Sequence, residues 1–173
     1  MGRTRTKKQL IKTTNMYDNR KQTQPYFQNK KTKAEEVAEK AINGYKSIKD
    51  SYPWKTTWIT IQADKDLTYF AEKLGKTLAD KNYGLTNSKI RSIYGEIKRI
   101  QTSGYEKQKP SFYLLRPKMA YAAGRELENA GVQLFKLFFE DAWKEVKDEK
   151  TFKNFCNLIE AVLAYHKAFG GKD

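Results

Sequence analysis

Residues 132–146 read Val-Gln-Leu-Phe-Lys-Leu-Phe-Phe-Glu-Asp-Ala-Trp-Lys-Glu-Val, and this stretch decides the fold class. Its apolar residues recur every three or four positions, the spacing that places side chains on one side of an α-helix. They are Val132, Phe135, Phe138, Phe139, Ala142, Trp143 and Val146. A helix with such a face is stable only where other elements cover it. The rest of the chain must therefore supply partners for it.

Segments on both sides of this stretch carry the same spacing. They begin at Ala34, at Asp64 or Asp66, at Thr86, at Pro117 and at Phe152. Thr32 and Thr151 are expected as the N-caps of the first and the last of them. Residues 54–63 have no convincing second strand to pair with and are expected as an aromatic loop, and residues 104–113 as a linker. The pattern predicts an all-α fold, a compact bundle of about five to six helices with a basic N-terminal arm.

The beginning of the chain is its most basic part. Residues 1–33 hold ten Lys and Arg side chains and one acid, Asp18, whereas the whole chain has 34 basic and 20 acidic side chains and a net charge of +14. Residues 1–32 offer almost nothing apolar to bury, so alone they should be disordered. We expect a basic extended arm at 1–32, an N-terminal helix plus aromatic loop at 33–63 and a helical bundle at 64–173.

The excess positive charge favours a polyanionic partner. No run approaches 18 apolar residues and the arm lacks a periodic apolar face, so nucleic acid is favoured over a membrane. The lack of a secretory signal makes the cytoplasm the expected location. Tyr26 and Phe27 of the arm would contact RNA bases or anchor a protein contact, whereas Trp54 and Trp58 are expected to pack on the bundle.

Few residues in the chain could support catalysis. Cys156 and His166 are its only cysteine and histidine, which excludes an internal disulfide and a site of several Cys or His ligands. Both fall on the apolar side of the last helix, where a structural role is expected. No glycine-rich phosphate loop is present, and no set of carboxylates has the spacing of metal ligands. The sequence therefore predicts no catalytic residue, no metal site and no cofactor.

The clearest surface signal is the helix after Leu114-Leu115-Arg116-Pro117-Lys118. Pro117 is expected at its first position, where a missing N–H costs nothing. Met119, Ala123, Leu127 and Ala130 would form its buried side. Lys118, Tyr121 and Arg125 gather on the other side, with Glu128 only at the edge. That side suits contacts with phosphates, and its alternative is an ordinary solvated helix face.

The helix after Thr86 carries a second basic face, opposite its isoleucines. Arg91, Gly95 and Lys98 lie in one narrow band, and Arg99 borders it. A glycine inside a helix costs about 1 kcal/mol relative to alanine. For Gly95, a close helix crossing is favoured over the approach of an RNA backbone as the reason.

Three spaced blocks resemble one known family. They are Gly84–Arg91 running into Ile97-Lys98-Arg99, then Leu115–Lys118 with Ala120–Arg125, then Phe152–Phe155 with Glu160–Lys167. In order and spacing they are similar to the small subunit of type III-A CRISPR effector complexes, the Csm small subunit. The likeness covers about residues 84–170, and residues 1–63 depart from the family pattern.

The resemblance implies a helical subunit without enzymatic activity. Its copies would pack against one another and against the backbone and large subunits of the complex, and would contact the guide (CRISPR) RNA and the paired target RNA. Together with Tyr121, the positions carried over as RNA contacts are Lys89, Arg91, Lys98, Arg99, Arg116, Lys118 and Arg125. We therefore predict a non-catalytic RNA-binding subunit of an antiviral ribonucleoprotein.

Two other classes of function remain as alternatives. A helical DNA-binding regulator would place the helix after Thr86 in a major groove, with Asn87 and Arg91 reading bases. An enzyme is the third possibility, and metal-dependent RNA cleavage would be its sign.

Overall fold

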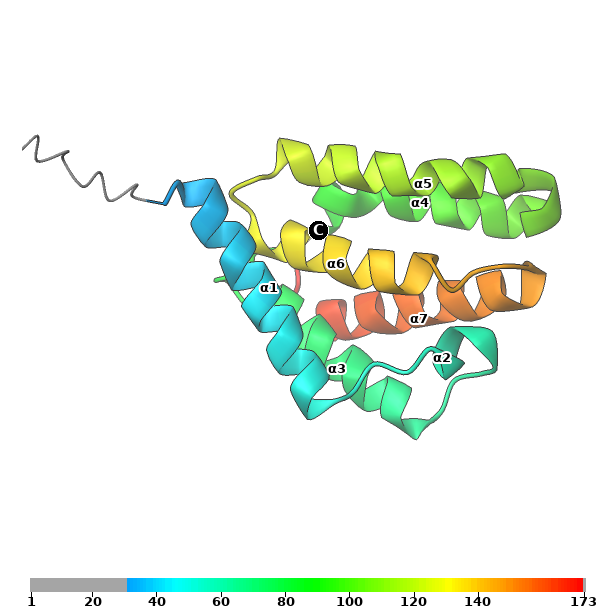
Figure 1. Cartoon of the computed structure of the whole chain (residues 1–173), viewed down its shortest axis with the longest axis horizontal. Helices are drawn as coiled ribbons and strands as arrows, with labels where there is room; N and C mark the ends of the chain where they lie inside the picture. Colours follow the sequence, from blue (N-terminus) through cyan, green and yellow to red (C-terminus); the bar gives the residue numbers. More distant parts are fainter. Residues whose placement is uncertain (1–30, 173) are drawn as a thin grey trace, which may run out of the picture. The chain divides into compact units, whose positions relative to one another are not determined.

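Seven α-helices lie within residues 31–172, the part of the chain that the computed structural model describes (Figure 1). They are α1 (Lys33–Ser51), α2 (Thr57–Thr60), α3 (Lys65–Ala79), α4 (Asn87–Ser103), α5 (Tyr105–Arg125), α6 (Ala130–Trp143) and α7 (Glu149–Ala168). Within that range no strand forms, and the Thr86–Lys172 pair is an isolated β-bridge. The all-α prediction is confirmed. Predictions for the first thirty residues, Tyr26 and Phe27 included, lie outside the described residues.

The helix starts follow from side chains that accept the free N–H groups of the first turn. The Thr32 side chain accepts from the N–H of Glu35 and caps α1, as predicted. For α7 the predicted cap is wrong. The Asp148 carboxylate accepts from the N–H of Thr151 at 2.8 Å, so α7 begins at Glu149, and Thr151 completes a capping box from inside the helix.

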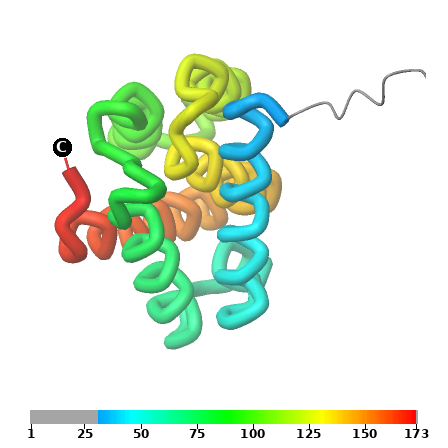
Figure 2. Tube along the Cα trace, turned by 90° about the vertical axis from the view of Figure 1, so that its left-hand side faces the viewer, coloured from blue at the N-terminus to red at the C-terminus, as the bar shows by residue number. Residues whose placement is uncertain are grey.

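The helices pack in pairs around one core. α3 lies along α7, and α1 packs across α6 (Figures 1 and 2). α4 and α5 form an antiparallel hairpin, joined at Gly104, whose φ of +86° suits glycine. α3 approaches α7 closely at Gly75, where an added Cβ would lie 2.6 Å from the Cβ of Tyr165. α4 and α5 thus stand together on one side of the core.

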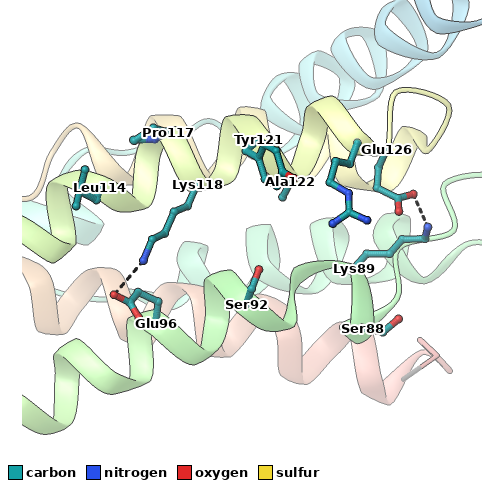
Figure 3. Close-up of a pocket in the computed structure, with 11 residues that line it drawn as sticks. Ser88, Lys89, Ser92, Glu96, Leu114, Pro117, Lys118, Tyr121, Ala122 and Glu126 are labelled. Carbon is teal, nitrogen blue, oxygen red and sulfur yellow. Dashed lines mark hydrogen bonds and ion pairs between the residues drawn. The ribbon is translucent and has the colours of Figure 1, made fainter.

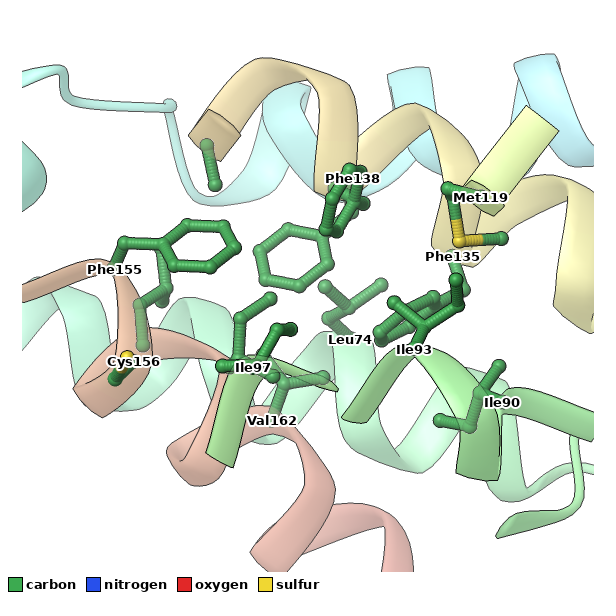
Figure 4. Packing of buried hydrophobic residues seen from close by; sticks show 14 of the residues in the cluster. Leu74, Ile90, Ile93, Ile97, Met119, Phe135, Phe138, Phe155, Cys156 and Val162 are labelled. Atoms are coloured by element: carbon green, nitrogen blue, oxygen red, sulfur yellow. The ribbon is translucent and has the colours of Figure 1, made fainter. Parts of the chain in front are cut away.

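The core is rich in phenylalanine, and the predicted stripes meet in it (Figure 4). Phe138 of α6, Ile97 of α4 and Phe155 of α7 are all fully buried. Cys156 is also buried, and burial raises the pKa of its thiol to about 12. The Nε2 of the buried His166 lies 3.0 Å from the carbonyl oxygen of Leu85. Both residues have the structural role expected of them.

The start of α5 corrects two predictions. Residues 104–113 are not a linker, because α5 already begins at Tyr105, and Pro117 lies inside it. The backbone leaves the helical region at Gln108, with φ of −110° and ψ of 16°, and then resumes. Pro110 thus lies in a new first turn, where its missing N–H has no intrahelical partner to lose. Pro117 and Tyr113, the residue four positions before it, are exposed, so water can reach the carbonyl that Pro117 leaves unpaired.

Two smaller differences between the sequence predictions and the structure concern Leu127 and the aromatic loop. The sequence places Leu127 in the core, but this residue follows the end of α5 and is 53% exposed. The aromatic loop contains the one-turn helix α2, and Trp58 of α2 is buried. The Trp54 ring packs edge-on to Trp58 at a centroid distance of 5.5 Å, so both rings pack on the bundle as predicted.

Candidate nucleic-acid interface

The solvent-facing side of α5 is an apolar ridge. Its members are Pro110, Tyr113, Leu114, Pro117, Ala120, Tyr121 and Gly124, all exposed. Helical spacing brings them to one side, opposite the buried Phe112, Leu115 and Met119. Tyr121 is the most exposed of them, at 69%. We call this surface the α5 ridge.

Basic side chains border the α5 ridge on both sides. Lys118 and Arg125 lie toward α4, and the Arg125 guanidinium is 5.9 Å from the centre of the Tyr121 ring. Arg116 lies on the other side, 5.6 Å from the Trp143 ring of α6. Between residues 109 and 125 α5 carries no acidic residue. The combination of aromatic, apolar and basic side chains is one that RNA-binding surfaces use.

A groove of about 890 Å³ runs between α4 and α5, beside the ridge (Figure 3). Ser88, Lys89 and Ser92 line it from α4, whereas Lys118, Tyr121 and Arg125 line it from α5. The structure therefore brings together four of the eight predicted RNA contacts: Lys89, Lys118, Tyr121 and Arg125. We call it the α4–α5 groove.

Carboxylates neutralise part of this groove, a feature that the pattern of single helices does not reveal. Lys89 pairs with Glu126, and the Lys118 ammonium lies 3.2 Å from a Glu96 carboxylate oxygen (Figure 3). Glu128, the acid expected at the edge, instead pairs with Lys33 of α1. The two acids that do reach the groove come from α4 and from the end of α5, so only the packed hairpin shows them.

Glu96 is the centre of the larger ion-pair network. Its two oxygens accept from the Arg99 guanidinium at 2.8 and 3.0 Å and one of them also pairs with Lys118. The hydrogen bonds from Arg99 and the neighbouring ammonium hold the pKa of Glu96 at about 2. Arg99 also donates to Gln108 and Ser111 of α5. Arg99 therefore ties the hairpin together and is less available to a ligand than Lys118 or Arg125.

The other basic face of α4 looks toward α7. Lys98 donates to the Glu160 carboxylate at 2.8 Å, which raises the pKa of Lys98. Arg91 is exposed, and within residues 31–172 it makes no hydrogen bond or ion pair. An added Cβ at Gly95 would meet nothing within 4 Å. The predicted helix crossing at Gly95 is therefore wrong, since this strip of α4 faces open space.

Residues 31–172 contain no group of three His, Cys, Asp or Glu side chains placed to hold a metal ion. In the same residues no helix has the length and apolar content that crossing a membrane requires.

Comparison with known proteins identifies the family. The family model Csm2 Type III-A matches residues 62–172, so it includes α3, which the three sequence blocks leave out. The CRISPR system Cms protein Csm2 of Streptococcus thermophilus is 35% identical over 100 residues, which span 53% of this chain and 78% of that protein. The resemblance drawn from the residues is confirmed. The chain belongs to the Csm2 family, the small subunit of type III-A CRISPR effector complexes.

Proposed function

We propose that this subunit binds the backbone of the guide RNA and of the target RNA paired with it, through the α5 ridge and the α4–α5 groove. One observation carries the proposal: between residues 109 and 125 the outward side of α5 has no acid and is bordered by basic residues on both sides. Lys and Arg in such an arrangement bind phosphates without reading sequence. Base pairing between guide and target would supply the sequence specificity.

The ion pairs of the groove are compatible with this role. A phosphate oxygen can take the place of a carboxylate as the partner of Lys118 or Lys89, because both anions accept charge-assisted hydrogen bonds. Surface ion pairs contribute at most about 1 kcal/mol, so exchanging them costs little. Arg125 has only the Tyr121 ring as a close partner within the described residues, so among the cations of the α4–α5 groove it is the one most open to a phosphate.

Contacts with other subunits are part of the same proposal. Ile42, Ile61 and Leu127 are each more than half exposed and lie on different parts of residues 31–172. Ile42 and Ile61, which lie outside α5, are available to further copies of the chain and to the backbone and large subunits. Native mass spectrometry of the assembled complex with an Ile61→Asp variant would measure whether fewer copies are retained.

The RNA proposal is tested by binding of the full chain to a guide–target RNA duplex, measured by fluorescence anisotropy. The variant Lys118→Gln/Arg125→Gln should bind about tenfold more weakly at low salt, because two cations no longer neutralise phosphates. The matched control is Lys73→Gln/Lys153→Gln, which removes the same charge from exposed positions on α3 and α7. Equally weakened binding in both variants would show that only net charge matters and would overturn the assignment. A preference for one DNA duplex would favour the regulator instead.

A further inference from the structure

A second groove, between α4 and α7, differs in chemistry from the α4–α5 groove. It encloses about 450 Å³, within the range of about 300–1,000 Å³ that is usual for small-ligand sites. Ile90, Tyr94, Leu163 and Ala164 give it an apolar and aromatic lining, and Arg91 and Glu160 are its charged members. We call it the α4–α7 groove. The proposed backbone contacts do not use it.

The charges of this groove leave one cation uncompensated. Glu160 is held by Lys98 at 2.8 Å, so its negative charge already has a partner. Arg91 has no hydrogen bond or ion pair within residues 31–172, and it is exposed. Next to it, Gly95 leaves the outward side of α4 open. A ligand for this groove should therefore carry an anionic group attached to an apolar or aromatic body.

We propose that the α4–α7 groove binds one unstacked RNA nucleotide, with the base against the Tyr94 ring and the apolar lining and a phosphate paired with Arg91. Every base has a π-face, so stacking on tyrosine tolerates any sequence. The Arg91 guanidinium can donate two parallel hydrogen bonds to one phosphate. This inference rests on the proposed function, since it takes RNA as the ligand class and adds a site on the far side of α4.

The size of the groove favours a nucleotide over a protein segment. A docked amphipathic helix needs a long groove with several anchor pockets at successive turns. Here the volume is small, and one arginine without an ion pair in residues 31–172, Arg91, lines the groove together with one aromatic ring, that of Tyr94. One planar ring with one phosphate matches those features. An acidic peptide is the competing occupant that the experiment must separate.

The experiment is a titration of the ¹⁵N-labelled full chain, followed by amide chemical shifts. The probes are adenosine 5′-monophosphate and ribose 5-phosphate, which has the sugar and the phosphate but no base. We expect the monophosphate to shift the amides of Tyr94, Gly95 and Ala164, and ribose 5-phosphate to shift them far less. Arg91→Gln should raise the Kd of the monophosphate about fivefold or more. Tyr94→Leu should do the same, whereas Tyr94→Phe, which keeps the ring, should bind like the wild type.

Three outcomes would overturn the inference. In the first, the monophosphate does not shift the amides of the groove. In the second, both probes shift them equally, which would mean that the groove binds only the anionic group. In the third, an acidic peptide shifts them and the nucleotide does not. The variant Lys118→Gln/Arg125→Gln separates this site from the proposed function. It should weaken binding of the RNA duplex and leave the monophosphate titration unchanged. If the monophosphate shifts no amide of the groove while duplex binding is normal, only the proposal for the α4–α7 groove is refuted. If the monophosphate shifts these amides while the chain does not bind the duplex, only the proposed backbone contacts are refuted.

Discussion

Helices α5 and α7 are similar in length, 21 and 20 residues, but they place their apolar residues in different ways. On α7 the large apolar side chains, such as Phe155 and Ile159, are buried, and Lys153 and Lys167 lie on its exposed side. α5 has two apolar sides. Only one of them is in the core, while the α5 ridge lies in solvent with basic side chains at its borders.

Packing in the core accounts for the apolar side of α7, but for only one of the two apolar sides of α5. A helix that packs on one side gains nothing from apolar side chains on the other, because that side stays in water. Large exposed apolar patches on a subunit usually mark a surface that binds something. The comparison therefore supports the proposal that the outer side of α5 binds a ligand, whereas the buried side of α7 stabilises the core.

The largest expected effect tests this division directly. Phe155→Ala on α7 should lower the free energy of unfolding by about 3–5 kcal/mol, because it leaves a cavity in the core. Tyr113→Ala on the α5 ridge should change it by no more than about 0.5 kcal/mol. Urea denaturation of both variants measures the difference. If Tyr113→Ala is as damaging as Phe155→Ala, the outer side of α5 is structural and the comparison fails.

Two glycines extend the comparison to the helices beside α5 and α7. Gly75→Ala should destabilise by about 1–3 kcal/mol, since its Cβ would press on Tyr165 and on the α7 backbone. Gly95→Ala should stabilise by about 0.5–1 kcal/mol, because the site is open and alanine favours helix. Thermal unfolding measures both. A destabilised Gly95→Ala variant would mean that α4 is covered at this point after all.

A smaller effect is expected from Glu96, the carboxylate that neutralises the border of the α5 ridge. Glu96→Gln frees Lys118 and Arg99, so affinity for the RNA duplex should rise about two- to fivefold. The control is Glu36→Gln on α1, which also removes one negative charge but lies outside the hairpin of α4 and α5. Fluorescence anisotropy at low salt measures both. Weaker binding by Glu96→Gln would show instead that Glu96 positions the two cations for RNA.

The pH dependence of the same pair should be the smallest effect. The pKa of Glu96 is about 2 in the folded chain and is ordinarily about 4.5. A lowered carboxylate pKa stabilises the fold fully above the ordinary value, and this contribution disappears as the pH falls toward the folded value. The stability difference between wild type and Glu96→Gln should thus be constant from pH 8 to 5 and shrink between about pH 4.5 and 2. A difference that disappears by pH 6 would contradict the pairing.

Much of this fold can be predicted because spacing within one helix decides which side is buried. The stripes that hold Ile97 and Phe138 follow directly from that spacing. The ion pair of Glu96 with Lys118 does not, since those residues lie on different helices and meet only through packing. The predicted helix start at Pro117 is wrong because the irregular backbone at Gln108 allows an earlier start, which no local pattern indicates.

The residues of the candidate site also fall into two groups, those that the sequence of one helix predicts and those that only the packing of two helices brings together. Lys118, Tyr121 and Arg125 belong to one helical stripe of the sequence, and the structure places them together. Two features depend on how the hairpin of α4 and α5 packs. One is the α4–α5 groove, which both helices line, and the other is the position of Arg91 beside α7. Side chains on one helix are predictable as a set, whereas a surface built by two helices requires the structure.

The central claim is that the borders of the α5 ridge hold RNA phosphates, and the salt dependence of binding tests it most directly. For the wild-type chain, the logarithm of RNA affinity should fall linearly with the logarithm of salt concentration. In Lys118→Gln/Arg125→Gln the slope should be shallower by about 1.4–1.8, since each phosphate that is no longer neutralised accounts for about 0.7–0.9. In Lys73→Gln/Lys153→Gln the slope should not change. An unchanged slope in the first variant would contradict the account.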